Sequence, residues 1–161
     1  MNYTVSPCVH AELPQVYALI NARIRWMDEM GLDQWNTVNY WDAYPESHYE
    51  DAVTQGCLYV IKDLDRIVGA LVLRESDPYW DDSTPACYFH NFATALDAKG
   101  AGKKLLDFCA ELALKKGKQY LRMDCAVSNQ KLNEYYENLG FALVGDFWDD
   151  VYHANKRQKL L

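Results

Sequence analysis

The residues with the clearest chemical meaning form a short turn rich in glycine and lysine. It reads Lys99-Gly100-Ala101-Gly102-Lys103. Residues 86–94 before it are typical of a strand, and residues 105–113 after it carry an apolar stripe at helical spacing. The start of a helix presents unpaired backbone N–H groups. Glycine lets the backbone approach a ligand and lysine adds positive charge, so the turn predicts a phosphate site.

Two common phosphate-binding motifs are excluded at this turn. A P-loop needs Ser or Thr after its Gly-Lys pair and a glycine five residues earlier, but the chain has Lys104 and Asp97 at these positions. A dinucleotide fingerprint needs a third glycine where Leu105 stands. What remains is a strand–GxG–helix element, and the alternative interpretation is a structural helix that merely begins with two glycines.

Candidates for proton transfer lie in the same half of the chain. His90, in the expected strand before the turn, is a candidate general base because a free imidazole titrates near neutrality. A single histidine in a strand is also commonly a structural residue. Asp124, or an acid of the Asp81-Asp82 pair, could do the same work directly or through a water molecule.

Aromatic and acidic residues gather in two segments of low periodicity, residues 32–49 and 75–85. Such side chains can hold a small cationic substrate by charge and by cation–π contact. The substrate-binding candidates are Trp35, Tyr40, Trp80 and Asp81. The alternative interpretation is a hydrophobic cover with solvated acids beside it.

The order of expected elements is mixed α and β. Expected strands are Tyr3–Val9, Leu58–Ile61, Ile67–Leu73, Ala86–Thr94, Tyr120–Val127, Phe141–Phe147 and Val151–Leu160, with Trp148-Asp149-Asp150 as the last turn. Helices are expected from Leu13 to Gly31, after Gly102 and after Asn129, with Gly140 closing the last. Since no linker or repeat interrupts them, residues 1–161 are predicted to form a single domain around one sheet.

The amino-acid composition disfavours several classes of partner and site. The 161 residues are 50% hydrophobic and 14% aromatic and carry a net charge of −7, which disfavours nucleic acid as a partner. No CxxC pair occurs among the five cysteines, so neither a zinc site nor a disulfide framework is expected. No signal peptide or apolar span is recognised, and we therefore expect a cytoplasmic protein with no membrane partner.

Two segments resemble the signatures of one family, the GNAT superfamily of N-acetyltransferases. Residues 99–106 (KGAGKKLL) resemble its acetyl-CoA pyrophosphate loop, and residues 129–141 (NQKLNEYYENLGF) resemble its second signature. The resemblance implies a GNAT-like α/β fold, with a mostly antiparallel sheet of six to seven strands. That sheet would be splayed at the cofactor site and flanked by about four helices.

The resemblance also implies roles for individual residues. The cofactor-binding residues for acetyl-CoA are Phe92, Ala93, Thr94, Lys99, Gly100, Ala101, Gly102, Lys103 and Asn129. Tyr136 matches the family's general acid, which protonates the leaving thiolate, although it also fits a core aromatic. The edge of strand 92–94 would pair with the amide-bearing arm of the cofactor, and one N–H there would polarise the thioester carbonyl. Asp97 departs from the Arg or Gln with which the family's loop usually opens, and Ala98 stands at the next position, where the family has a small residue.

The sequence therefore predicts an acetyl-CoA-dependent N-acetyltransferase for a small cationic primary amine, acting by direct attack and without a metal. Two alternatives stay open: a protein N-terminal or lysine acetyltransferase, and a CoA-binding regulatory or structural module without catalysis. By analogy with family members, a homodimer is expected, with the aromatic-rich C-terminal strands as its candidate interface.

Overall fold

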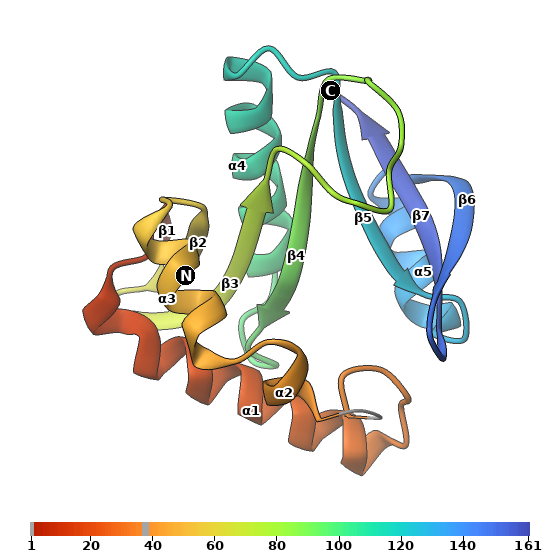
Figure 1. Ribbon diagram of the computed structural model, residues 1–161. Coiled ribbons are helices and arrows are strands. Elements are labelled where there is room, and N and C mark those ends of the chain that lie inside the picture. The colour runs from red at the N-terminus through yellow and green to blue at the C-terminus, as the bar shows by residue number, and fades with distance from the viewer. Residues whose placement is uncertain (1, 37–38) are drawn as a thin grey trace. The chain divides into compact units, whose positions relative to one another are not determined.

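A computed structural model describes residues 2–36 and 39–161 (Figure 1). Thr37 and Val38, inside the aromatic-rich segment 32–49, lie outside the described residues. The elements are β1 (Tyr3–Pro7), the 3₁₀ helix η1 (His10–Glu12), α1 (Leu13–Met30), α2 (Tyr40–Ala43), α3 (Glu46–Thr54), β2 (Leu58–Asp63), β3 (Arg66–Arg74), β4 (Ala86–Thr94), α4 (Ala101–Lys115), β5 (Tyr120–Ala126), α5 (Gln130–Asn138), β6 (Ala142–Asp149) and β7 (Tyr152–Leu160). Every expected strand is present, and the predicted fold class is confirmed.

The seven strands form one open sheet in the order β1-β2-β3-β4-β5-β7-β6. The pairs β1–β2, β2–β3, β5–β7 and β6–β7 are antiparallel, whereas β4 and β5 are parallel. The printed register of the parallel pair runs from Ala86↔Tyr120 to Tyr88↔Arg122. The sheet is therefore mostly antiparallel, as expected.

The chain divides into two compact units, which are described separately. The first comprises residues 1–73 and 90–108, and the second comprises residues 74–89 and 109–161. The boundary falls inside β4, inside α4 and before the last residue of β3, so each of these elements contributes residues to both units.

The first unit has its own hydrophobic core. Its fully or nearly buried members come from η1's flanks, α1, α2, α3, β2, β3 and β4, and include Cys8, Leu13, Val16, Ile20, Tyr40, Tyr49, Ala52, Leu58, Val60, Val72 and Ala93. Gly31 ends α1 in the left-handed region, with φ +63°, as its type and position predicted. Burial of the apolar stripe of α1 is what fixes this helix in the unit.

In the second unit, β7 lies between β5 and β6 (Figure 1). The turn between β6 and β7 is shorter than expected, because Trp148 and Asp149 belong to β6 and only Asp150 and Val151 turn. The reason is local: Trp148 pairs with His153 across the hairpin, and their rings stack with centroids 4.1 Å apart.

Candidate active site

The glycine turn has the geometry of a helix start. Backbone bonds Ala98 N–H to Ala95 O and Ala101 N–H to Ala98 O, each 3.2 Å, wind the chain into α4. Gly100 adopts φ +81°, and a Cβ placed on it would meet nothing within 4 Å. The N–H groups of Gly102 and Lys103 lie in the first turn of α4, where helices lack internal acceptors. Open space and the unpaired N–H groups of a helix start fit a diphosphate, so the residues present suit coenzyme A.

Charged side chains around this turn are already paired with one another. Lys103 Nζ lies 2.6 Å from Asp107 one turn further along α4. The two terminal nitrogens of Arg66 each lie 2.9 Å from a carboxylate oxygen of Asp97, which keeps the pKa of Asp97 below its usual value. Both pairs are solvent-exposed and therefore weak enough to rearrange when an anion binds.

β1 supports the turn from the side. The Tyr3 hydroxyl donates to the carbonyl of Lys99 over 3.2 Å, and Lys104 Nζ donates to the carbonyl of Tyr3 over 2.5 Å. These bonds fix the backbone on which the predicted phosphate ligands Lys99 and Gly100 stand.

The strand that leads to the turn contains an unexpected backbone feature. Asn91, in the middle of β4, has φ +51°, which is unusual for any residue other than glycine. Its side-chain Nδ2 donates to the Tyr40 hydroxyl (2.9 Å), and its Oδ1 accepts from His48 Nε2 (3.0 Å). The available signal was the residue type, since asparagine is rare in strands and tolerates the left-handed region.

The aromatic segment before β2 builds a buried cluster. Tyr40 is 3% exposed and its hydroxyl is hydrogen-bonded to that of Tyr49. Trp35 packs on Tyr40, with ring centroids 5.0 Å apart. Tyr40, a predicted substrate residue, thus directs its polar atom to Asn91 and Tyr49, while Trp35 is half-buried beside it.

Tyr136, the predicted general acid, lies on α5 in the second unit. Its ring packs against Phe89, Tyr135 and Phe141, and the side chain is 5% exposed. Burial raises the pKa of its hydroxyl well above 10. The phenol is therefore protonated throughout the physiological pH range, as a proton donor must be.

α5 is held in place by two asparagines. Asn129 caps it by accepting from the N–H of Leu132 (3.1 Å), so one side-chain oxygen of this predicted cofactor residue is engaged within the helix. The buried Asn133 donates to the carbonyls of Ala126 and Asn129 and accepts from Arg157. This second asparagine was not singled out from the sequence, although it fixes the helix that carries Tyr136.

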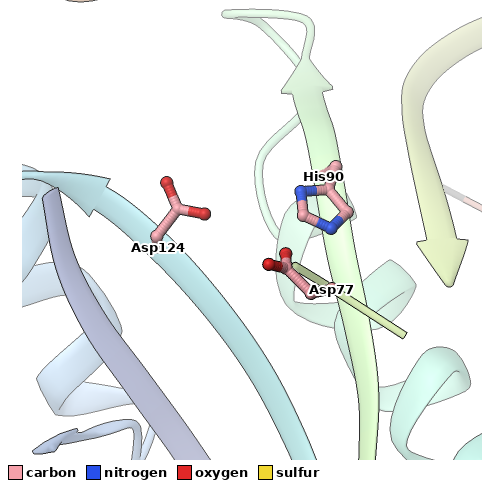
Figure 2. Close-up of side chains that lie close together, drawn as sticks. All are labelled: Asp77, His90 and Asp124. Carbon is pink, nitrogen blue, oxygen red and sulfur yellow. The ribbon is translucent and has the colours of Figure 1, made fainter. Parts of the chain in front are cut away.

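The predicted bases occupy different elements. His90 lies on β4 and is half-buried (Figure 2). Asp124 lies on β5 and accepts from the Tyr152 hydroxyl at 3.2 Å. Within the second unit, the carboxylates of Asp124 and the buried Asp77 offer oxygens within 4.8 Å of each other (Figure 2).

The polar loop 75–85 is anchored by a buried arginine. Arg122 forks onto Asp82 with distances of 2.7 and 2.9 Å and lowers the pKa of that carboxyl. Its guanidinium lies 4.3 Å from the centre of the Trp80 ring, and Lys156 Nζ lies 5.1 Å from the same centre. The cation–π contact expected at Trp80 for a substrate is thus made by the chain's own cations, whereas Asp81 is exposed.

The chain belongs to the acetyltransferase (GNAT) family, whose model matches residues 18–141. It is accordingly an acetyl-CoA-dependent N-acetyltransferase. The chain is 32% identical over 111 residues to the UPF0039 protein sll0451 of Synechocystis. The aligned region covers 61% of this chain and 70% of that protein.

Two solved structures share the fold. An acetyltransferase of the GNAT family from Listeria monocytogenes matches with a TM-score of 0.81 and 21% identity, over 99% of this chain and 95% of that one. The PaiA N-acetyltransferase of Thermoplasma acidophilum, solved with coenzyme A, matches with a TM-score of 0.78 and 14% identity over the whole of both chains. No helix in residues 2–36 or 39–161 has the length and apolarity to cross a bilayer.

Proposed function

We propose that this single-domain enzyme transfers the acetyl group of acetyl-CoA to the primary amine of a small cationic metabolite. The observation that carries the proposal is the open glycine turn at the start of α4, with Gly100 at φ +81° and nothing within 4 Å of its Cβ position. A diphosphate bound there is held by the amides of residues 99–103. Phe92, Ala93 and Thr94 would pair with the amide-bearing arm, and the side chain of Asn129 would contact it.

The reaction needs two proton transfers. The amine nitrogen attacks the thioester carbonyl carbon, and the C–S bond then breaks. Tyr136 gives its hydroxyl proton to the departing thiolate and is reprotonated from solvent. His90, directly or through water, takes the proton that the amine loses. Because the pKa of Tyr136 is raised by burial, the phenol is a weak acid, and its contribution depends on being held close to the sulfur.

The preference for a cationic amine rests on the acidic composition and the aromatic cluster. The net charge of −7 draws cations to the protein, and Trp35 and the exposed Asp81 offer a ring and a carboxylate. We also propose a homodimer in the cytoplasm. It is supported by exposed apolar side chains on the C-terminal hairpin, namely Leu143, Val144, Trp148 and Val151. Size-exclusion chromatography with light scattering tests the dimer.

The deciding experiment measures thiol release from acetyl-CoA over a panel of small amines, peptides and lysine-containing proteins. Turnover with small polyamines or aminoglycosides supports the proposal. Turnover confined to peptides or proteins identifies a protein acetyltransferase instead. Tight binding of coenzyme A without turnover on any acceptor would identify a binding module.

Tyr136→Phe tests the assignment of the acid, and Tyr135→Phe is its matched control on the same helix. We expect the first variant to lower kcat about 100-fold while the dissociation constant for coenzyme A changes little. Tyr135 is 39% exposed, and its variant should retain kcat. Equal rates for the two variants would remove Tyr136 from the mechanism.

A further inference from the structure

Asn91, the left-handed residue of β4, links this strand to the helices α2 and α3 of the first unit. Asn91 stands directly before Phe92, the first residue proposed to pair with the cofactor arm. On its other side, its carboxamide reaches α2 and α3, through Tyr40 (2.9 Å) and His48 (3.0 Å). One side chain therefore joins the aromatic cluster to the strand that handles the thioester.

The backbone conformation of Asn91 requires support. The left-handed conformation is unfavourable for a residue with a Cβ, although less so for asparagine, whose short polar side chain can form local hydrogen bonds. It also interrupts the alternation of a strand and re-aims the neighbouring peptide groups. Such outliers persist where surrounding contacts over-determine them, and they concentrate at functional sites.

The supporting contacts are well buried. Tyr40 and Tyr49 are 3% and 1% exposed, their hydroxyls hydrogen-bond to each other, and the Tyr40 hydroxyl also accepts from Asn91. Burial raises the pKa of Tyr40 to about 12, so its hydroxyl is neutral and its hydrogen-bonding pattern is constant. Ala93, two residues beyond Asn91, packs in the same core cluster as these tyrosines. Phe92 is consequently held from both sides.

We propose that Asn91 is a positioning residue for acetyl transfer. Its carboxamide, held by Tyr40 and His48, sets the direction of the peptide groups of β4 that polarise the thioester carbonyl. The inference rests on the proposed function, and it assigns no direct substrate contact to Asn91. The aromatic cluster then acts on the reaction through the backbone of β4, in addition to any contact that its members make with an acceptor.

Two variants separate the effect of the backbone conformation of Asn91 from the effect of its side-chain hydrogen bonds. Asn91→Gly keeps the left-handed conformation accessible but removes both hydrogen bonds. Tyr40→Phe leaves Asn91 intact and removes the hydroxyl on which its Nδ2 rests. Leu64→Gly is the matched control, because Leu64 has φ +56° in the β2–β3 turn and is 84% exposed.

The primary measurement needs no acceptor. Acetyl-CoA labelled with ¹³C at its carbonyl is bound to each variant, and the isotope-edited infrared stretch of the thioester is recorded. We expect a lower stretching frequency on the wild-type protein than in solution, and a return towards the solution value in Asn91→Gly and Tyr40→Phe. Turnover should fall about 10-fold in Asn91→Gly, with the dissociation constant for coenzyme A changed less than about threefold. The double variant should lose no more than Asn91→Gly, because both changes break one network.

A purely structural role predicts a different result. The melting temperature would fall in the Asn91 and Tyr40 variants while the thioester frequency and kcat stayed at wild-type values, and that result would overturn the proposal. If Asn91→Gly does not fold, Tyr40→Phe alone decides by the same two readings. A wild-type protein that fails to bind acetyl-CoA would instead refute the proposed function.

Discussion

Arg66 forms a bidentate ion pair with Asp97, in which each terminal guanidinium nitrogen lies 2.9 Å from one carboxylate oxygen. Asp97 occupies the position where the family's loop usually carries Arg or Gln. Arg66, at the start of β3, supplies the positive charge that pairs with it. The pair brings a positive group beside the glycine turn but cancels its charge. Its effect on an anionic ligand is therefore small while the pair is intact.

Breaking the pair from either side should change the affinity for coenzyme A in opposite directions. Asp97→Ala frees Arg66 and should tighten binding about 2- to 5-fold, whereas Arg66→Ala leaves the acid unopposed and should weaken it by a similar factor. Isothermal titration at low salt measures both, and the difference should shrink in 0.5 M NaCl because exposed charges are screened. Asp150→Ala, in the β6–β7 turn, controls for net charge. Identical affinities for all three variants would contradict a role for the pair.

The glycine turn makes a second prediction, about Gly100. Alanine at φ +81° is strained by about 1 kcal/mol, and the strain should distort the amides that hold the phosphates. Gly117, just past the other end of α4, has φ +74° and equally open surroundings. Gly100→Ala and Gly117→Ala should therefore lose similar stability in urea, but only the first should weaken coenzyme A, by about 10-fold. Equal affinities would mean that the turn does not bind the phosphates.

Much of this fold could be predicted because periodicity and capping residues mark its elements directly. Gly31, Asn129 and Gly140 each end or begin a helix where their side-chain types predicted. The glycine turn was identified because its chemistry lies in consecutive residues. Contacts between segments distant in sequence could not be found in this way.

The hydrogen bonds of Asn91 are an example of contacts that could not be predicted from the sequence. Its partners Tyr40 and His48 are 51 and 43 residues away, so no local pattern in the sequence indicates these hydrogen bonds. The two hydrogen bonds from Arg122 to Asp82, 40 residues earlier, likewise leave no local pattern in the sequence. The sequence interpretation that placed Trp80 at a substrate could not anticipate a cation supplied by the chain itself.

The Arg122 contact leads to a third prediction, on stability. Arg122→Lys keeps the charge but loses the two hydrogen bonds to Asp82 and the guanidinium that lies 4.3 Å from the centre of the Trp80 ring. We expect a loss of about 1–3 kcal/mol in the free energy of unfolding, measured in urea, since Arg122 is 3% exposed and a lysine ammonium could not satisfy all the acceptors that the guanidinium binds. Lys103→Ala is the control, because its ion pair is exposed and should contribute little. A change of less than about 0.5 kcal/mol would show that the loop does not depend on this arginine.

The buried tyrosines predict how stability responds to alkali. Burial raises the pKa of Tyr40 to about 12 and raises the pKa values of Tyr49 and Tyr136 above their usual value, whereas an unfolded tyrosine ionises near 10. Below pH 10 both states keep these protons, so the tyrosines add no pH dependence. Above pH 10 the unfolded state binds fewer protons, and stability falls by up to about 1.4 kcal/mol per pH unit for each such group.

For Tyr40 this loss should continue until the pH reaches about 12, where the folded state also releases its proton. Urea unfolding between pH 8 and pH 11 should therefore show a plateau followed by a decline. In Tyr40→Phe the free energy of unfolding should decline less steeply with pH. The difference should correspond to about one proton, because phenylalanine does not ionise in either state. Tyr135→Phe, at an exposed position, should leave the slope unchanged. An undiminished slope in Tyr40→Phe would mean that this hydroxyl reaches solvent, and the anchoring of Asn91 would lose its buried support.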